Sequence, residues 1–434
     1  MAEVRMTLTK EEQEILEGKK GEVFQKVMKS LVRYGEALDA ERLVNIEWPG
    51  HFSIPFAIAG TGLRLEMLDE LVEAGLKTKY PFTLDPKSPS DFENLFVNEE
   101  QKRSIEEMLV NQDVYDKRML QLGLRDEDAY TCTPYFPEVG NIPEKGAILA
   151  WSESSCVVYA NSVLGARTNR NAAIMDILSN IAGKTPLAGL LTDEGRRASW
   201  KIEVTTTNLP NPQLLGAAIG MTVLEDVPYI IGLDRFFGTE MNEVTRDFLK
   251  EMGAACAAIG AVGLYHVDNI TPEAVDQSRD LLLPACNSFR IGDSELERLM
   301  DSYPVMWEDK NAKPQKCLVG CPHLSLRELE WWDEKIHAAL EAHGKKRVSV
   351  NTVLCAAPQV LKEFKADKAR YENLKDVGVR LSETCIEAYM DNQLCAREAV
   401  ITNSNKLRAF TPARMFLDED LVEVIVTGEM QKED

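Results

Sequence analysis

The chain has 434 residues, of which 44% are hydrophobic and 27% charged. These values are typical of a globular protein with more than one domain, because a single hydrophobic core rarely extends over so long a chain. The net charge of −21 repels phosphate backbones and anionic lipids, so we expect neither nucleic acid nor a membrane as a partner.

The first predicted elements are helices. Thr9 and Glu12 form a capping box, and apolar residues then recur at helical spacing as far as Val32. No apolar signal segment precedes them, and the apolar stretch at residues 216–233 carries two acidic residues near its centre, which excludes a membrane span. We therefore expect a cytoplasmic protein whose nine cysteines are reduced thiols.

From there, short apolar runs alternate with amphipathic helical patterns. The runs predicted as strands cover residues 145–152, 227–233, 261–267, 316–321, 347–354 and 378–385. The segments predicted as helices cover residues 113–124, 243–260, 326–344 and 357–374. This alternation predicts an α/β fold with mostly parallel sheets. We place domain boundaries at charged or Pro-rich turns, giving an N-terminal α/β region (1–130), a central α/β domain with the substrate-binding segment (131–290) and a C-terminal α/β domain (291–434).

Three cysteines lie at or near the ends of predicted strands, where ligands bind in α/β sheets. Cys132 is in YTCTPY, Cys321 ends KCLVGC, and Cys385 ends GVRLSETC. Irregular loops of this kind supply thiolates to iron–sulfur clusters. The alternative for each thiol is that it packs in the core as a small hydrophobe, which is our prediction for Cys256 in the apolar helix.

Two histidines are candidates for acid–base chemistry. His51 follows a Pro-Gly turn, and His266 leaves a predicted strand two residues before Asp268, which would orient it. Both positions also suit ordinary loop histidines. His323 follows Cys321 by two residues, so it either lines the same crevice or caps a turn.

Residues 153–171, ESSCVVYANSVLGARTNRN, are unusually rich in hydrogen-bond donors. Guanidinium groups three residues apart, with amides and hydroxyls between them, suit the binding of a carboxylate or phosphate. A polar loop joining two elements is the alternative. The candidates for substrate binding are Asn161, Ser162, Arg167, Thr168, Asn169 and Arg170, together with Lys406 in TNSNK.

Signatures of several common enzyme classes are missing. NIAGKT ends like a phosphate-binding loop, but Leu178 stands where that loop needs its first glycine. AGTGLRL lacks the third glycine of a dinucleotide-binding fingerprint, and the sequence has no G-x-S-x-G motif. ATP binding, NAD binding and serine hydrolysis are therefore not indicated.

YTCTPY, WSESSCVVYANSVLGARTNRN, YHVDNITPEA, GCPHLSL and TNSNK, in this order, closely resemble the large catalytic subunit of the aconitase X family, from about residue 7 to the C-terminus. The resemblance implies an aconitase-like multi-domain α/β/α scaffold. It also implies an iron–sulfur cluster, [4Fe-4S] or [2Fe-2S], held by Cys132, Cys321 and Cys385. In many members a small subunit carries the swivelling domain and a catalytic serine. We expect that domain to be absent from this chain, which would then need the partner.

The resemblance further implies a hydro-lyase that removes water from a small hydroxy acid. Known family activities act on cis-3-hydroxy-L-proline, which we prefer, and on mevalonate 5-phosphate, which is the alternative. His51 or His266, the latter oriented by Asp268, would supply the acid. A non-catalytic RNA-binding aconitase relative is a rival that the net charge disfavours. A second rival is a structural subunit that binds no cluster and has no catalytic activity.

Overall fold

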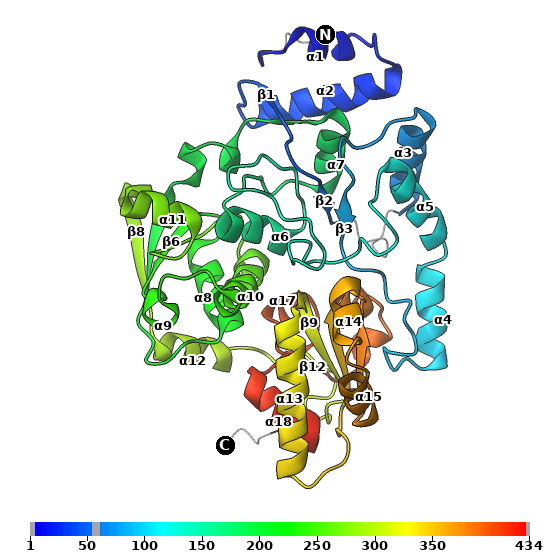
Figure 1. Cartoon of the computed structure of the whole chain (residues 1–434), viewed down its shortest axis with the longest axis vertical. Helices are drawn as coiled ribbons and strands as arrows, with labels where there is room; N and C mark the ends of the chain where they lie inside the picture. Colours follow the sequence, from blue (N-terminus) through cyan, green and yellow to red (C-terminus); the bar gives the residue numbers. More distant parts are fainter. Residues whose placement is uncertain (1–4, 54–60, 431–434) are drawn as a thin grey trace.

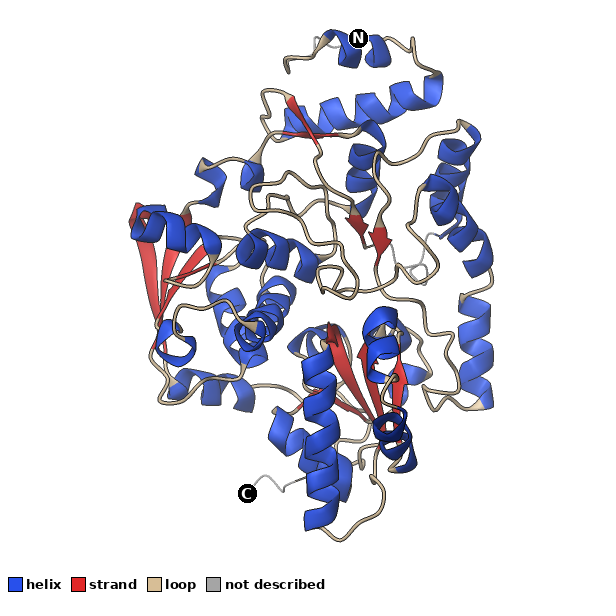
Figure 2. Cartoon of the chain, viewed as in Figure 1, coloured by secondary structure: helices blue, strands red, loops and turns tan. Residues whose placement is uncertain are grey.

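Two parallel sheets, each with helices packed against it, dominate the fold (Figure 1). The computed structural model describes residues 5–53 and 61–430. The α/β class with mostly parallel sheets, predicted from the sequence, is confirmed (Figure 2).

The N-terminal part is mostly helical, and the capping box of Thr9 and Glu12 is formed. Its helices are α1 (Lys10–Leu16), α2 (Glu22–Ala37), α3 (Thr61–Glu73), α4 (Glu99–Met108), α5 (Gln112–Leu122), α6 (Ser154–Tyr159) and α7 (Ala173–Ala182). Strand β1 (Leu43–Asn45) pairs with β4 (Lys184–Pro186) in antiparallel fashion, and β2 (His51–Phe52) pairs with β3 (Thr83–Leu84) in parallel. The short β2–β3 pair sets the position of the residues that follow each strand.

The next part of the chain builds a four-stranded parallel sheet in the order β7-β6-β5-β8. Its strands are β5 (Ala198–Val204), β6 (Pro228–Ile231), β7 (His266–Val267) and β8 (Leu282–Ile291). Its helices are α8 (Pro212–Val223), α9 (Asp234–Phe237), α10 (Glu243–Ile259), α11 (Pro272–Gln277) and α12 (Asp293–Asp301). Glycines let α8 and α10 approach closely, since a Cβ on Gly216 would lie 2.2 Å from the Met252 carbonyl oxygen.

The C-terminal part forms a five-stranded parallel sheet in the order β11-β10-β9-β12-β13. Its strands are β9 (Lys316–Leu324), β10 (Asn351–Ala356), β11 (Val379–Ser382), β12 (Val400–Thr402) and β13 (Arg414–Met415). Its helices are α13 (Leu326–Ala342), α14 (Pro358–Phe364), α15 (Lys368–Asp376), α16 (Ile386–Met390), α17 (Asn405–Phe410) and α18 (Asp418–Thr427).

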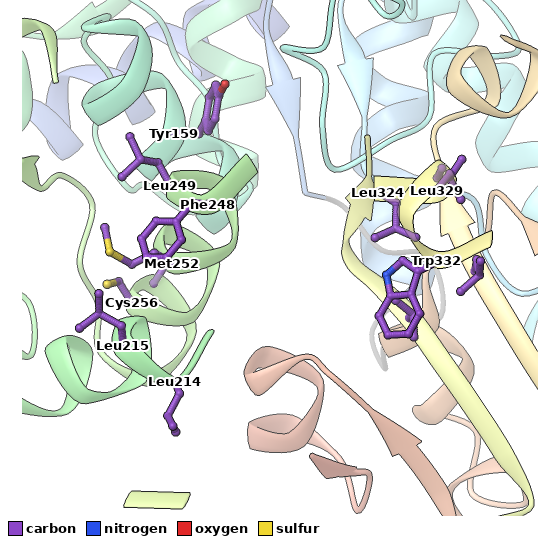
Figure 3. Close-up of a cluster of buried hydrophobic side chains, with 14 of the residues drawn as sticks. Tyr159, Leu214, Leu215, Phe248, Leu249, Met252, Cys256, Leu324, Leu329 and Trp332 are labelled. Carbon is purple, nitrogen blue, oxygen red and sulfur yellow. The ribbon is translucent and has the colours of Figure 1, made fainter. Parts of the chain in front are cut away.

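One large apolar core extends across both sheets. Figure 3 shows part of it, with Met252 and Cys256 of α10 on one side and Leu324 and Trp332 on the other. Cys256 is fully buried among these side chains, which confirms the prediction that it packs in the core. No helix in residues 5–53 and 61–430 is long and apolar enough to span a membrane.

Candidate active site

A cavity of about 400 Å³ brings the predicted thiols together, because Cys132, Cys321 and Cys385 all line it. Each arrives on a different part of the chain. Cys132 lies in the loop beyond Tyr130, which bridges to Leu84, whereas Cys321 lies within β9 and Cys385 caps α16 directly after β11. The strand predicted to end at Cys321 continues in the structure to Leu324, the last residue of β9.

Backbone amides point at two of these sulfurs. The His323 amide donates to Cys132 Sγ over 3.2 Å, and the Ala388 amide donates to Cys385 Sγ over 3.4 Å. Burial raises the pKa of all three thiols, that of Cys321 to about 12. N–H donation to sulfur is one way a protein stabilises thiolates bound to a cluster.

The described residues contain no group of three or more His, Cys, Asp or Glu side chains placed to hold a metal ion. An iron–sulfur cluster separates its thiolate ligands by its own irons and sulfides, so its ligands need not converge as closely as those of one ion. Three thiols on one cavity, two of them receiving amide hydrogen bonds, fit a cluster better than a single ion.

An ion pair lies in the wall of the same cavity. Lys406 of α17 donates to Glu153 over 2.8 Å and lies 3.7 Å from Glu387. Although burial alone would raise it, the pKa of Glu153 falls to about 2, because Lys406, the Ser155 hydroxyl and the Cys156 amide all stabilise the carboxylate. Burial alone would lower the pKa of Lys406, but the two carboxylates raise it well above its usual range.

Arg170 supplies the second cation. It is exposed at the cavity mouth beside Asn171, and partial desolvation lowers the pKa of its guanidinium. No hydrogen bond or ion pair joins it to another residue that the structure describes. Its donors are therefore available to a ligand, as predicted for an anion-binding group.

The other predicted donors of residues 161–169 are outside the cavity lining. Asn161 donates to the carbonyls of Thr168 and Gly263, and the Ser162 hydroxyl accepts from the Tyr265 amide. The remaining three also bond within the protein: Thr168 accepts from the Trp151 amide, Asn169 bonds the backbone of Ala188 and Leu190, and Arg167 pairs with Asp193. These side chains hold the segment in place and so position Arg170.

The predicted acid–base residues also differ in their distance from the cavity. His266 is buried, bonds the Arg196 carbonyl and has its pKa lowered by burial, while Asp268 accepts from the Tyr229 hydroxyl. Neither lines the cavity. His51 is also buried, but its Nε2 lies 3.6 Å from Asp85 Oδ1, and Asp85 does line the cavity. His323 lines the cavity, and burial lowers its pKa to about 3.

Sequence reasoning missed four carboxylates of this cavity: Asp85, Glu153 as the partner of Lys406, Glu387 and Asp391. Asp85 directly follows the two-residue strand β3, which was not predicted. Glu153 and Glu387 begin short helices beside predicted site residues. A search for carboxylates flanking the predicted ligands would have found both.

Family models match nearly the whole chain: the first aconitase X domain at residues 5–194, the second at 191–301 and the third at 315–423. The chain belongs to the aconitase X family. The holo-form aconitase X of Thermococcus kodakaraensis superposes with a TM-score of 0.78 at 30% identity, over 96% of this chain and 99% of that one. The first and third aconitase X domains line the cavity described above.

Curated relatives of this aconitase X chain have two kinds of name. The phosphomevalonate dehydratase large subunit of Thermococcus kodakarensis is 35% identical over 78% of each chain. That of Methanocaldococcus jannaschii is 29% identical over 94% of this chain and 96% of its own. The cis-3-hydroxy-L-proline dehydratase of Pseudomonas aeruginosa is 28% identical over 92% of this chain and 66% of its own.

Proposed function

We propose that the chain is the large subunit of an iron–sulfur dehydratase that removes water from a small hydroxy acid. The observation that carries this proposal is the meeting of Cys132, Cys321 and Cys385 with Arg170 and Lys406 on one cavity. Dehydratase names among relatives from both substrate groups support the reaction class.

Cys132, Cys321 and Cys385 would hold the cluster. When bound with only three thiolates, it would supply a Lewis acid beside the substrate's leaving hydroxyl. Arg170 would bind a carboxylate or phosphate of the substrate, since its donors are unused. Lys406, held by Glu153, would present a fixed positive charge to the same anion.

Two substrates follow from different observations. Five relatives named phosphomevalonate dehydratase large subunit, at 29% identity or more, favour mevalonate 5-phosphate over the cis-3-hydroxy-L-proline preferred from the sequence. The cavity itself favours the imino acid, because its lining carboxylates (Asp85, Glu153, Glu387 and Asp391) outnumber its cations and disfavour a polyanion. Mevalonate 5-phosphate is our first candidate and cis-3-hydroxy-L-proline our second.

We also propose a small partner subunit, because the phosphomevalonate dehydratase relatives are named large subunits. That subunit would complete the cavity and supply the base that takes the proton from carbon. The isolated chain would then bind the cluster without turning over substrate.

The test is anaerobic purification of the chain alone and with a co-expressed small subunit, followed by assays of iron, sulfide and dehydration of both substrates. We expect cluster in both preparations and turnover in the complex. A complex that carries a full cluster and dehydrates neither substrate would contradict the proposed reaction. A chain free of iron and sulfide after anaerobic purification would contradict the proposed cofactor.

A further inference from the structure

Asp85 presents a carboxyl group to the cavity, and the polar side chains that lower its pKa are those of His51 and Ser53. Asp85 follows β3, and its Oδ1 atom is buried without a hydrogen-bond partner among the described residues. A buried carboxyl oxygen normally has such a partner, because leaving it unpaired costs about 1–3 kcal/mol. This oxygen faces His51 Nε2 over 3.6 Å, just beyond hydrogen-bond distance, so the histidine holds the carboxyl group from behind while Asp85 lines the cavity.

His51 lies behind this carboxyl group in an orientation fixed by its own neighbours. Its Nδ1 lies 2.9 Å from the Thr83 hydroxyl, and its ring meets Trp151 edge-on with centroids 5.6 Å apart. Its Nε2 faces Asp85 Oδ1 over 3.6 Å and has no hydrogen-bond partner among the described residues. The ring itself is outside the cavity lining, so it reaches the cavity through Asp85.

The groups around Asp85 shift its pKa in both directions. Burial raises the pKa of Asp85, and the Glu153 carboxylate raises it further, whereas His51 and the Ser53 hydroxyl lower it. The Asp85 carboxylate in turn raises the pKa of Glu387, of Cys385 and of Cys156. The other carboxyl groups of the lining differ from it, since Glu153 is bonded to Lys406, Glu387 lies within ion-pair distance of Lys406, and Asp391 is exposed.

We propose that Asp85 is the catalytic acid of this chain and that His51 is its positioning residue. This inference rests on the proposed dehydratase function. The proton of the Asp85 carboxyl passes to the leaving hydroxyl oxygen. The carbon–oxygen bond breaks with its electron pair going to that oxygen, and water departs. The electron pair of the adjacent C–H bond forms the double bond, and its proton passes to a basic side chain of the partner subunit. Through exchange with solvent, the partner's base then releases its proton and Asp85 takes one up, so the net products are the alkene and water.

The first test is Asp85→Asn in the assembled two-subunit enzyme, because Asn keeps the shape and lacks the acidic proton. We expect kcat to fall by about 10² to 10⁴-fold, the usual contribution of a general acid. Iron and sulfide per chain, and the affinity for substrate measured without turnover, should stay at the wild-type level. Asp85→Glu should restore part of kcat, and Asp276→Asn, on the surface beside Lys145, should leave it unchanged.

The second test separates positioning from structure by two substitutions of His51. Gln places a polar atom near the Nε2 position, which faces Asp85, and Asn places one near the Nδ1 position, which faces Thr83. An acid must be protonated, so kcat falls as pH rises through the pKa of Asp85. Because His51 lowers that pKa, His51→Asn should move the falling limb to higher pH, and His51→Gln should keep it near wild type.

Each outcome has one meaning. Wild-type kcat in Asp85→Asn with a full cluster overturns the inference and leaves the dehydratase proposal intact. An unchanged pH profile in His51→Asn overturns the role of His51. If Asp85→Asn loses its cluster, Asp85→Glu is tested in its place, with kcat expressed per bound cluster. A pH profile of Asp85→Glu identical to that of wild type then overturns the inference. A wild-type complex inactive on both substrates overturns the dehydratase proposal and this inference together.

Discussion

The buried pair of Lys406 and Glu153 determines how the cavity responds to mutation. Breaking a buried ion pair by removing one partner leaves an uncompensated charge and costs roughly 3–5 kcal/mol. We therefore expect Lys406→Met to lower the free energy of unfolding by about that amount in urea titrations. Lys19→Met, which removes an exposed ion pair with Glu17, should change the free energy of unfolding far less, because water screens exposed charges. Equal effects of the two substitutions would contradict the role of Lys406 in the folded chain.

The same pair predicts a pH dependence of stability. The pKa of Glu153 is depressed in the folded chain from 4.5 to about 2. Between these two pH values the folded state therefore binds fewer protons than the unfolded state. The stability that Glu153 contributes is therefore complete above its unfolded pKa and is lost as pH falls from about 4.5 towards 2. Urea titrations of wild type and Glu153→Gln across this range should converge at the acidic end. Parallel curves would show that Glu153 does not titrate in this way.

The three thiols on the cavity predict a pattern of cluster loss. Serine at Cys132, Cys321 or Cys385 should each reduce iron and sulfide per chain under anaerobic purification, because each removes one ligand. Cys286→Ser is the matched control, since Cys286 is a partly exposed thiol of β8 outside the cavity lining. Retention of a full cluster in any of the first three variants would remove that cysteine from the proposed ligand set.

At the scale of elements, the chain from α6 to residue 170 shows what a polar segment can do besides binding. A π-helical turn (Ala160–Leu164) follows α6, and the donors after it bond to backbone carbonyls or to Asp193. Arg167 and Arg170, three residues apart, thus have different roles. Arg170→Gln should raise KM in the assembled enzyme. Arg167→Gln should leave KM near wild type, because Arg167 is outside the cavity lining and its ion pair with Asp193, which is 90% exposed, contributes little to holding the segment. A larger rise in KM for Arg167→Gln would reverse these assignments.

Sequence patterns identified the elements with clear periodicity. The helices predicted at residues 243–260 and 326–344 match α10 and α13 closely, and the strand at 227–233 contains β6. The predicted strand at 145–152 does not form, and only Ile148 and Trp151 make isolated bridges. An apolar run shows that a segment is buried, but the partner strand that would pair with it lies elsewhere in the chain.

The limits of local sequence patterns also explain why some cavity residues were predicted and others were not. The rule that ligands bind at strand ends pointed to all three thiols, although in the structure Cys132 follows an isolated bridge, Cys321 lies within β9, and only Cys385 follows a strand of a large sheet. The roles of Asn161 and Asn169 could not be predicted, since an amide bonds a backbone carbonyl as readily as a ligand. Asp85 was missed because its two-residue strand is too short to produce an alternating pattern.

At the scale of the whole molecule, the cavity joins the first aconitase X domain to the third and leaves the second outside. Cys132 belongs to residues 5–194, and Cys321 and Cys385 belong to residues 315–423. A cluster bound by all three thiols would therefore add a further connection between two domains that already meet through the backbone bridge of Lys87 and Thr384. The sheet of β5 to β8, in the second domain, contributes no residue to the cavity lining.

This arrangement predicts which backbone segments lose stability when the cluster is removed. Because ligand binding stabilises the segments that it joins, chelation of iron under anaerobic conditions should raise amide hydrogen exchange around residues 130–135 and 384–390 together. Exchange in β5 (Ala198–Val204) should stay constant and serves as an internal control. Exchange that rises in only one of the two cavity segments would mean that the cluster does not connect the domains. A uniform rise that includes β5 would mean that iron stabilises the chain as one unit rather than joining its first domain to its third.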